Sequence, residues 1–274
     1  MALTVEVIFN SGSGSFADEK VDEIAQLFDN AGVNARVHLV KKGEDISDIS
    51  MQAAGGDAEI VVAAGGDGTI STVASALVGS SKSLGVIPLG TLNNFSKDLN
   101  LPQTVPEAID VIVSNQTETI DIGSVNGRCF INNSSIGLYP RIVLHRERQQ
   151  RLGRSKLWAA VWAAIRMMRI SPFLKVRLTL DNTELVRKTL FVFIGNNAYE
   201  MDLYNIGRRA ALDNGMLSVY LLRGGGRLGV ISMVIRTFLG LLRQTKNFEE
   251  LQTEELTIEM RRNNVLVAQM ARCQ

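Results

Sequence analysis

Short apolar runs alternate with amphipathic segments along the first 120 residues. Four apolar runs predict strands, at residues 5–9, 33–40, 60–64 and 84–89. Three segments with apolar side chains at helical spacing predict helices, at residues 17–31, 46–54 and 70–77. The run at 60–64 is apolar throughout, as in a strand that helices cover on both faces. This order predicts an α/β fold with a doubly wound parallel sheet, which binds ligands at the carboxyl ends of its strands.

Hairpin signals replace this alternation after residue 122. The dipeptide Asn126-Gly127 predicts a tight turn between residues 122–123 and 129–131. Further strands are predicted at residues 176–180, 185–194 and 217–222, and helices at 155–170 and 227–243. We therefore expect two domains, an α/β domain at residues 1–122 and a β-rich domain at residues 123–274.

Composition narrows the class of protein. The 274 residues include 29 Lys and Arg against 28 Asp and Glu, and 46% are hydrophobic, which excludes a disordered chain and argues against a general nucleic-acid binder. Cys129 and Cys273 are too few for a disulfide framework. The N-terminus lacks signal-peptide features, and no run of about 18 uncharged apolar residues is present. We expect a soluble, cytoplasmic protein.

Residues 65–69, Gly-Gly-Asp-Gly-Thr, follow the fully apolar strand. Glycines let backbone N–H groups approach a phosphate closely. A carboxylate beside bound phosphate needs a cation between them, so Asp67 indicates a magnesium-mediated triphosphate site, with Thr69 contacting phosphate. The alternative is a tight turn with a helix-capping Asp.

Three other segments extend this picture. Residues 90–94 follow the next strand and are a second glycine-containing candidate for phosphate binding. The alternative is an ordinary strand-to-helix connection with an Asn cap. Asp121 precedes Ile122-Gly123 and could add a third polar group at this sheet edge. Residues 12–17 fit G-x-G-x-x-A, and the pair Lys41-Lys42 would suit a 2′-phosphate, so an NADP-binding reductase is a rival interpretation.

Taken together, these motifs resemble the diacylglycerol kinase catalytic-domain family, which includes sphingosine kinases and bacterial lipid kinases. The matching segments are residues 10–14, 65–69, 88–93, 121–123, 132–137, 195–197 and 212–217. Gly-Gly-Asp-Gly alone is shared with NAD kinases and phosphofructokinases. The combination with Gly-Thr-Leu-Asn-Asn-Phe and the late Asp-Asn-Gly is more specific.

The resemblance implies a nucleotide-binding N-terminal domain and a C-terminal antiparallel β-sandwich domain for the lipid substrate. It implies an ATP site formed by Asn10, Gly12, Gly14, Gly65, Gly66, Asp67, Gly68, Thr69, Ile70, Ser71, Gly90, Thr91 and Asn93. The catalytic residues would be Asp67 and Asp121, which organise Mg²⁺ and its waters. A second, structural Mg²⁺ site would map to Ala211, Asn214 and Met216.

The sequence departs from the family pattern at four places, one of which is Leu39 or Val40, where some relatives place a nucleotide-contacting Thr. Asn94 and Asn214 stand where many members carry Asp. The family's general base is the Glu of an Asp-Gly-Glu motif, expected after Ala268, where this chain reads Gln-Met-Ala-Arg-Cys-Gln. One hypothesis is a frameshift after Ala268 or Gln269, since CAG-ATG-GC shifted back by one base contains GAT-GGC, which encodes Asp-Gly. The alternative is a natural, divergent tail.

The segment 141–169 carries eight Arg and Lys residues, one Glu, and both Trp residues on an apolar helical stripe. Such a segment suits an anionic membrane surface. The alternative is that both Trp residues pack into the second domain.

The sequence thus predicts an ATP- and Mg²⁺-dependent kinase that phosphorylates a hydroxyl of a diacylglycerol- or sphingoid-like lipid. This enzyme would serve phospholipid metabolism, contact membranes peripherally through 141–169 and bind no nucleic acid. Its oligomeric state stays open. The alternatives are a nucleotide- or lipid-binding pseudokinase, which the missing Asp-Gly-Glu favours, and a kinase of a soluble substrate resembling NAD kinase.

Overall fold

The computed structural model separates the chain into two units. One comprises Met1–Asn132 with Ala271–Gln274, and the other Asn133–Met270. The residues described are 3–11, 17–41, 45–137, 174–181, 183–189, 191–199, 209, 211–222, 248–260 and 264–273. The separation falls ten residues after the boundary expected at residue 122, because the hairpin that follows this residue groups with the first unit.

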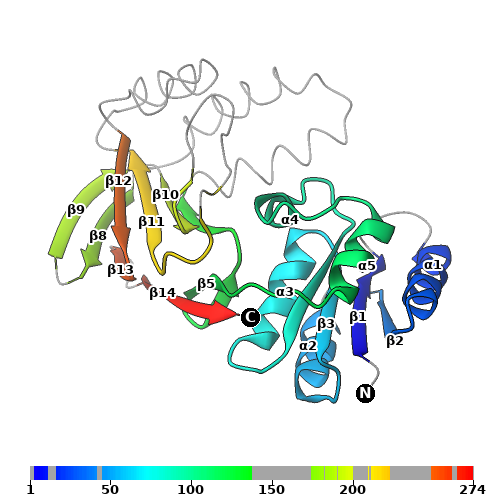
Figure 1. Ribbon diagram of the computed structural model, residues 1–274. Helices are drawn as coiled ribbons and strands as arrows, with labels where there is room; N and C mark the ends of the chain where they lie inside the picture. Colours follow the sequence, from blue (N-terminus) through cyan, green and yellow to red (C-terminus); the bar gives the residue numbers. More distant parts are fainter. Residues whose placement is uncertain are drawn as a thin grey trace. The chain divides into compact units, whose positions relative to one another are not determined.

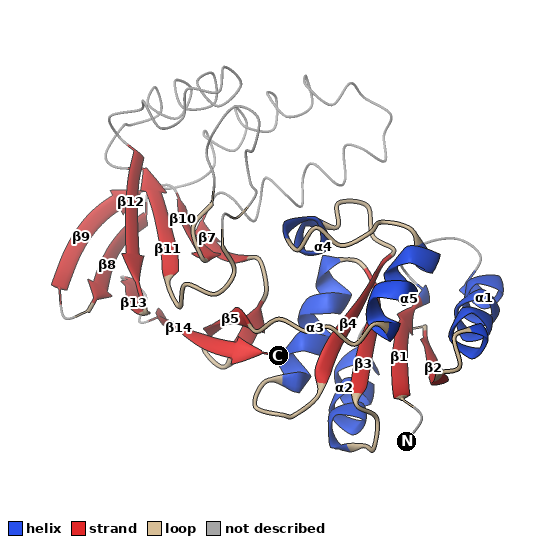
Figure 2. Ribbon diagram, viewed as in Figure 1, coloured by secondary structure: helices blue, strands red, loops and turns tan. Residues whose placement is uncertain are grey.

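The first unit contains a four-stranded parallel sheet in the order β2-β1-β3-β4 (Figure 1, with β4 labelled in Figure 2). Its strands are β1 (Thr4–Asn10), β2 (Asn34–Val40), β3 (Ile60–Gly65) and β4 (Ser83–Pro88). The central strands pair in register, with Val5 opposite Ile60 and Ile60 opposite Ser83. The four strands predicted for this half are confirmed.

Helices cover both faces of this sheet (Figure 2). On one face, α1 (Ala17–Asn30) and α5 (Val105–Val113) enclose a core that includes Phe28, Val62 and Ile109. On the other face, α2 (Asp45–Gly55) packs on α3 (Asp67–Leu77). Every residue of β3 is buried as a consequence, so its uninterrupted apolar sequence is explained.

Two short elements complete this unit. Helix α4 (Asn94–Asp98) follows β4, and a hairpin joins β5 (Ile120–Val125) to β6 (Arg128–Phe130). Asn126 and Gly127 have φ values of 48° and 76°, as a two-residue turn with both central residues left-handed requires. The hairpin predicted from Asn-Gly is therefore confirmed.

The second unit contains two antiparallel sheets, as the expected fold class requires. One sheet has the order β12-β11-β10-β7, and the strands of the other sheet that lie mainly in this unit follow the order β14-β13-β8-β9. The first comprises β7 (Asn133–Gly137), β10 (Phe191–Asn196), β11 (Leu217–Leu222) and β12 (Phe248–Thr253). The second comprises β8 (Leu174–Leu180), β9 (Thr183–Thr189), β13 (Glu255–Met260) and β14 (Asn264–Cys273).

The single strand predicted at 185–194 is wrong in one respect, because the chain changes sheets within it. Strand β9 pairs with β8, whereas β10 pairs with β7 and β11. At the change, the hydroxyl of the fully buried Thr189 donates to the Phe191 carbonyl at 2.7 Å and accepts from the Phe191 N–H at 3.3 Å. These bonds satisfy backbone groups that leave one ladder before the next begins.

The helices predicted at 155–170 and 227–243 lie outside the described residues. Within the part of the chain that is described, no helix combines the length and apolar character needed to cross a bilayer.

Candidate functional site

The glycine-rich motif after β3 is only partly a loop. Gly65 ends the strand, Gly66 is the N-cap residue of α3, and the helix begins at Asp67 instead of the predicted residue 70. The N–H of Ile70 already bonds to the Gly66 carbonyl at 3.1 Å. The first N–H groups of α3, those of residues 67–69, therefore precede the first helical bond and point out of the helix end.

Close approach explains the glycines in this turn. A Cβ at Gly65 would lie 2.6 Å from the Thr69 hydroxyl oxygen. A Cβ at Gly90 would lie 2.6 Å from the Cα of Gly66. The two glycine-rich segments after β3 and β4 are thus in backbone contact, which places their polar groups at one edge of the sheet.

The carboxylate of Asp67 links these two segments. Its Oδ2 accepts a hydrogen bond from the backbone N–H of Asn94 at 3.1 Å, and its Oδ1 accepts from the N–H of Phe95 at 3.0 Å. The capping role considered from the sequence is therefore real, but the helix that Asp67 caps is α4, not its own. The backbone amides of Asn94 and Phe95 therefore belong to the candidate site, and sequence reasoning missed them because a backbone group forms no side-chain motif.

Asn10 brings the end of β1 to the same place. Its Nδ2 donates to the Thr69 hydroxyl at 2.9 Å, and Thr69 is 5% exposed. Ile70 is fully buried, whereas Ser71 and Thr91 are at least partly exposed. Gly12 and Gly14 lie outside the described residues.

Asn93 adopts the left-handed conformation, with φ 51°, as the N-cap residue of α4. It is 8% exposed, and its Nδ2 donates to the Pro88 carbonyl at 3.5 Å and to Gln103 at 3.4 Å. Its Oδ1 is buried and accepts no hydrogen bond from the described residues. A buried amide oxygen beside two glycine turns is available to a ligand that carries a donor or a positive charge.

Asp121 lies in β5, where it is 2% exposed. Gly123 faces Phe130 across the hairpin, and a Cβ at Gly123 would lie 2.2 Å from the Phe130 ring. The glycine of Asp121-Ile122-Gly123 therefore makes room for an aromatic ring, while the Asp provides the carboxylate of the motif.

The residues matched to a structural metal lie in the second unit. Ala211 and Met216 are partly exposed and Asn214 is exposed. The Met216 carbonyl accepts the N–H of Asn197 at 3.1 Å, which ties the segment to the end of β10. Among the residues that the structure describes, no three His, Cys, Asp or Glu side chains form a preformed metal cluster.

The sequence did not single out an aromatic cluster beside these residues. Phe193, Tyr199 and Tyr220 meet edge to face at centroid distances of 5.6, 5.9 and 6.4 Å. The guanidinium of the buried Arg209 lies 6.0 Å from the Tyr199 ring centroid and donates to the Asn196 carbonyl at 3.4 Å. Gly195 is the one sequence feature that relates to this cluster. A Cβ at Gly195 would lie 2.6 Å from the Tyr199 ring, so the ring needs a glycine at this position.

Two further expectations from the sequence concern the basic segment and the general base. The basic segment 141–169 lies outside the described residues. Ala268 and Gln269, where the general base was expected, lie in β14 opposite Leu256 and Glu255.

Comparison with known proteins gives a consistent result. A diacylglycerol kinase of Staphylococcus carnosus (strain TM300) is 33% identical over 140 residues, which cover 50% of this chain and 46% of the relative. A diacylglycerol kinase of Bacillus subtilis (strain 168) is 35% identical over 130 residues, covering 46% of this chain and 43% of the relative. The matched region thus spans less than half the length of these relatives.

Similarity in fold extends over the whole chain. The crystal structure of a diacylglycerol kinase from Bacillus anthracis str. Sterne superposes with a TM-score of 0.73 at 18% identity, covering 98% of this chain and 94% of that one. The family model of the diacylglycerol kinase catalytic domain matches residues 4–125, which hold both glycine turns, Asp67 and Asp121. Through these residues, the chain matches the diacylglycerol kinase catalytic-domain family.

Proposed function

We propose that the chain is an ATP- and Mg²⁺-dependent lipid kinase that transfers the γ-phosphoryl group to a hydroxyl of a diacylglycerol- or sphingoid-like lipid. The observation that carries this proposal is the position of Asp67. Its carboxylate lies where two glycine turns touch and where two helices begin. Phosphoryl transfer depends mainly on positioning and charge neutralisation, which such a site can supply.

The nucleotide phosphates would bind at the start of α3. The N–H groups at residues 67–69 and the helix dipole favour an anion there, and Gly65, Gly66 and Gly68 add no side chain that would block it. Asn10 orients the Thr69 hydroxyl by its 2.9 Å hydrogen bond. Gly12, Gly14, Ile70, Ser71, Gly90 and Thr91 complete the proposed nucleotide site, Ile70 through its backbone.

The oxygen groups of this region fit Mg²⁺. Mg²⁺ in kinases usually takes one or two protein carboxylates, nucleotide phosphates and waters, so a cluster of three acidic side chains is not required. Each Asp67 oxygen accepts one N–H and keeps a further lone pair. Asn93 Oδ1 offers a buried acceptor, and the family resemblance adds Asp121, in β5, as a second carboxylate. The bound ion would neutralise charge on the transferred phosphoryl group.

A second metal would use oxygen atoms of the segment 211–216, from the Ala211 and Met216 carbonyls and the Asn214 side chain. These are hard ligands of the kind that Mg²⁺ accepts. Asn214 contributes no charge, so we expect this site to bind more weakly than one with Asp.

The lipid class rests on the relatives, which are named diacylglycerol kinases. The β-rich second unit would hold the lipid, with segment 141–169 contacting the membrane surface. The attacking hydroxyl needs a group that orients it and accepts its proton. The place after Ala268 holds Gln269, which cannot act as a base. This one observation favours the second candidate, a nucleotide-binding pseudokinase.

The test is phosphorylation of diacylglycerol and sphingosine in mixed micelles with radiolabelled ATP, together with calorimetric binding of Mg·ADP. Asp67→Asn is the test variant, and Asp110→Asn, at an exposed position on α5, is the matched control. We expect lipid phosphate from wild type and the control, and about 10²-fold less or lower still from Asp67→Asn. Nucleotide binding without product would support the pseudokinase, and neither binding nor product would overturn both.

A further inference from the structure

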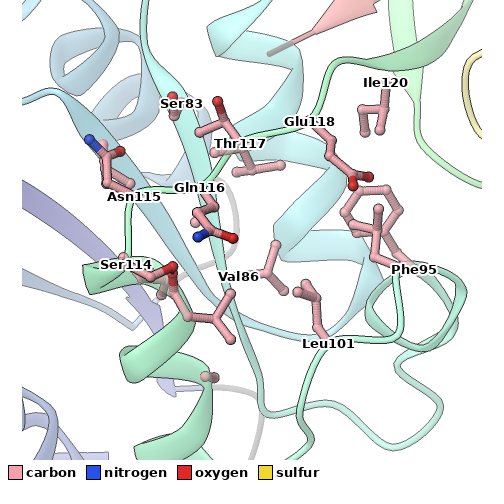
Figure 3. Close-up of a pocket in the computed structure, with 17 residues that line it drawn as sticks. Ser83, Val86, Phe95, Leu101, Ser114, Asn115, Gln116, Thr117, Glu118 and Ile120 are labelled. Atoms are coloured by element: carbon pink, nitrogen blue, oxygen red, sulfur yellow. The ribbon is translucent and has the colours of Figure 1, made fainter.

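A cavity of about 470 Å³ lies beside β4, within the first unit. It is lined by the strand from Ser83 to Val86, by Phe95 and Leu101 near α4, by α5, and by the polar segment 114–118 that follows α5. Figure 3 shows the side chains of this segment around the same hollow as Val86, Phe95 and Leu101. Neither glycine turn lines the cavity, and Phe95 is the residue that it shares with the candidate functional site.

The backbone of β4 provides hydrogen-bonding groups at this cavity. The N–H of Ser83 bonds to the carbonyl of Glu59, just before β3, at 3.1 Å, and the N–H of Leu89 bonds to the carbonyl of Gly65 in β3 at 2.9 Å. Because successive residues of a strand point their backbone groups to opposite sides, those of Leu84 and Val86 point away from β3. In the described residues β4 is the edge of the sheet, and no backbone bond joins it to segment 114–120. The Leu84 carbonyl and the Val86 N–H therefore form an adjacent acceptor and donor.

The available edge is short. Pro88, the next outward-facing residue, has no N–H to donate. Segment 114–118 closes the other side of the cavity. An extended peptide adding a strand needs a longer row of paired groups, whereas a volume of this size falls within the range of small-molecule sites, about 300–1,000 Å³.

The lining also determines which charge a ligand can carry. It contains Val86, Phe95 and Ile112 as apolar walls and Glu118 as its one charged residue, with no Lys, Arg or His among the described lining. A phosphate or carboxylate would find no cation there and would meet a like charge.

We propose that this cavity is a second small-molecule site, which takes an uncharged, planar heterocycle with a donor beside an acceptor, such as a nucleobase without phosphate. The heterocycle would pair with the Leu84 carbonyl and the Val86 N–H. Binding of the heterocycle would alter the position of Asp67 in the candidate site, because Phe95 lines the cavity and its N–H donates to the Asp67 carboxylate at 3.0 Å.

The experiment titrates ¹⁵N-labelled wild-type chain with adenosine and with AMP, in the presence of saturating Mg·ADP to occupy the proposed nucleotide site. We expect adenosine to shift the amide resonances of Leu84, Val86 and Phe95, with AMP binding at least about tenfold more weakly. Thr117→Trp, in the lining, should weaken adenosine binding at least about tenfold. Thr119→Trp, exposed and outside the lining, should leave it within about twofold.

The wild-type spectra test the proposal even if a Trp variant fails to fold. Shifts confined to residues 65–71 and 90–94, equal binding of adenosine and AMP, or no binding at millimolar adenosine would each overturn it. Equal effects of the two Trp variants would also overturn it.

Discussion

The Asp67 carboxylate accepts the backbone N–H of Phe95 at 3.0 Å, so the first residue of α3 also holds the first turn of α4. One side chain therefore combines a structural role with the proposed role toward Mg²⁺. The two roles make different demands, because a helix cap needs only an acceptor oxygen whereas a metal ligand needs the charge.

Substitution of Asp67 should separate these roles. Asp67→Ala removes the acceptor and should lower the free energy of unfolding by about 1–2 kcal/mol. Asp67→Asn keeps one acceptor oxygen, so it should recover part of that stability while kinase activity stays about 10²-fold or more below wild type. Urea unfolding and the lipid kinase assay measure the two effects. Recovery of activity in step with stability would show that the role is structural alone.

Gly90 should tolerate no side chain. A Cβ there would lie 2.6 Å from Gly66 Cα and 2.7 Å from Asn93 Oδ1, both of which are fixed by backbone or burial. Gly90→Ala should cost about 1–3 kcal/mol of stability through overpacking. Gly68→Ala is the matched control, because no atom lies within 4 Å of its Cβ position and the residue is helical. It should stabilise the fold by roughly 0.5–1 kcal/mol, and thermal unfolding of both variants compares them.

Much of the first unit was predictable because its helices and strands follow local patterns. Buried parallel strands give apolar runs, and Asn126-Gly127 fixes a hairpin turn through two left-handed residues. The link from Asp67 to Asn94 and Phe95 joins residues 27 and 28 positions apart through backbone donors. Backbone donors carry no sequence signature, so no motif could reveal this contact.

In the second unit, the change of sheets between β9 and β10 was hidden from sequence analysis for a similar reason. Residues 185–194 contain no Gly or Pro that would mark a break between two strands. The bonds of Thr189 to Phe191 that mark the change depend on a single hydroxyl. The aromatic cluster around Tyr199 was missed because its members come from positions 193, 199 and 220, which share no short spacing.

The pair Arg187 and Glu249 should contribute measurably to the second unit. It joins β9 to β12 through two hydrogen bonds of 2.8 Å, both side chains are only 17% exposed, and the bond to Glu249 raises the pKa of Arg187. A double-mutant cycle to Ala should give a coupling energy of about 1–3 kcal/mol. Arg177 with Glu184, at 3.4 Å and 51% and 61% exposed, is the control and should give below about 0.5 kcal/mol. Equal coupling in both cycles would contradict this prediction.

Tyr220 should make the free energy of unfolding depend on pH in the alkaline range. Burial raises the pKa of its phenol above 10.0, and the neighbouring Glu250 acts in the same direction. The folded state therefore holds this proton more tightly than the unfolded chain, so the stabilisation is complete below about pH 10 and is lost as pH rises through the folded-state pKa. Tyr220→Phe also removes the acceptor of the Tyr199 N–H at 3.0 Å, which should cost about 1–3 kcal/mol at pH 7. In urea unfolding, the difference between wild type and Tyr220→Phe should be constant from pH 7 to 9 and shrink above pH 10. A difference that stays constant to pH 11 would show that the pKa of Tyr220 is the same in the folded and the unfolded state.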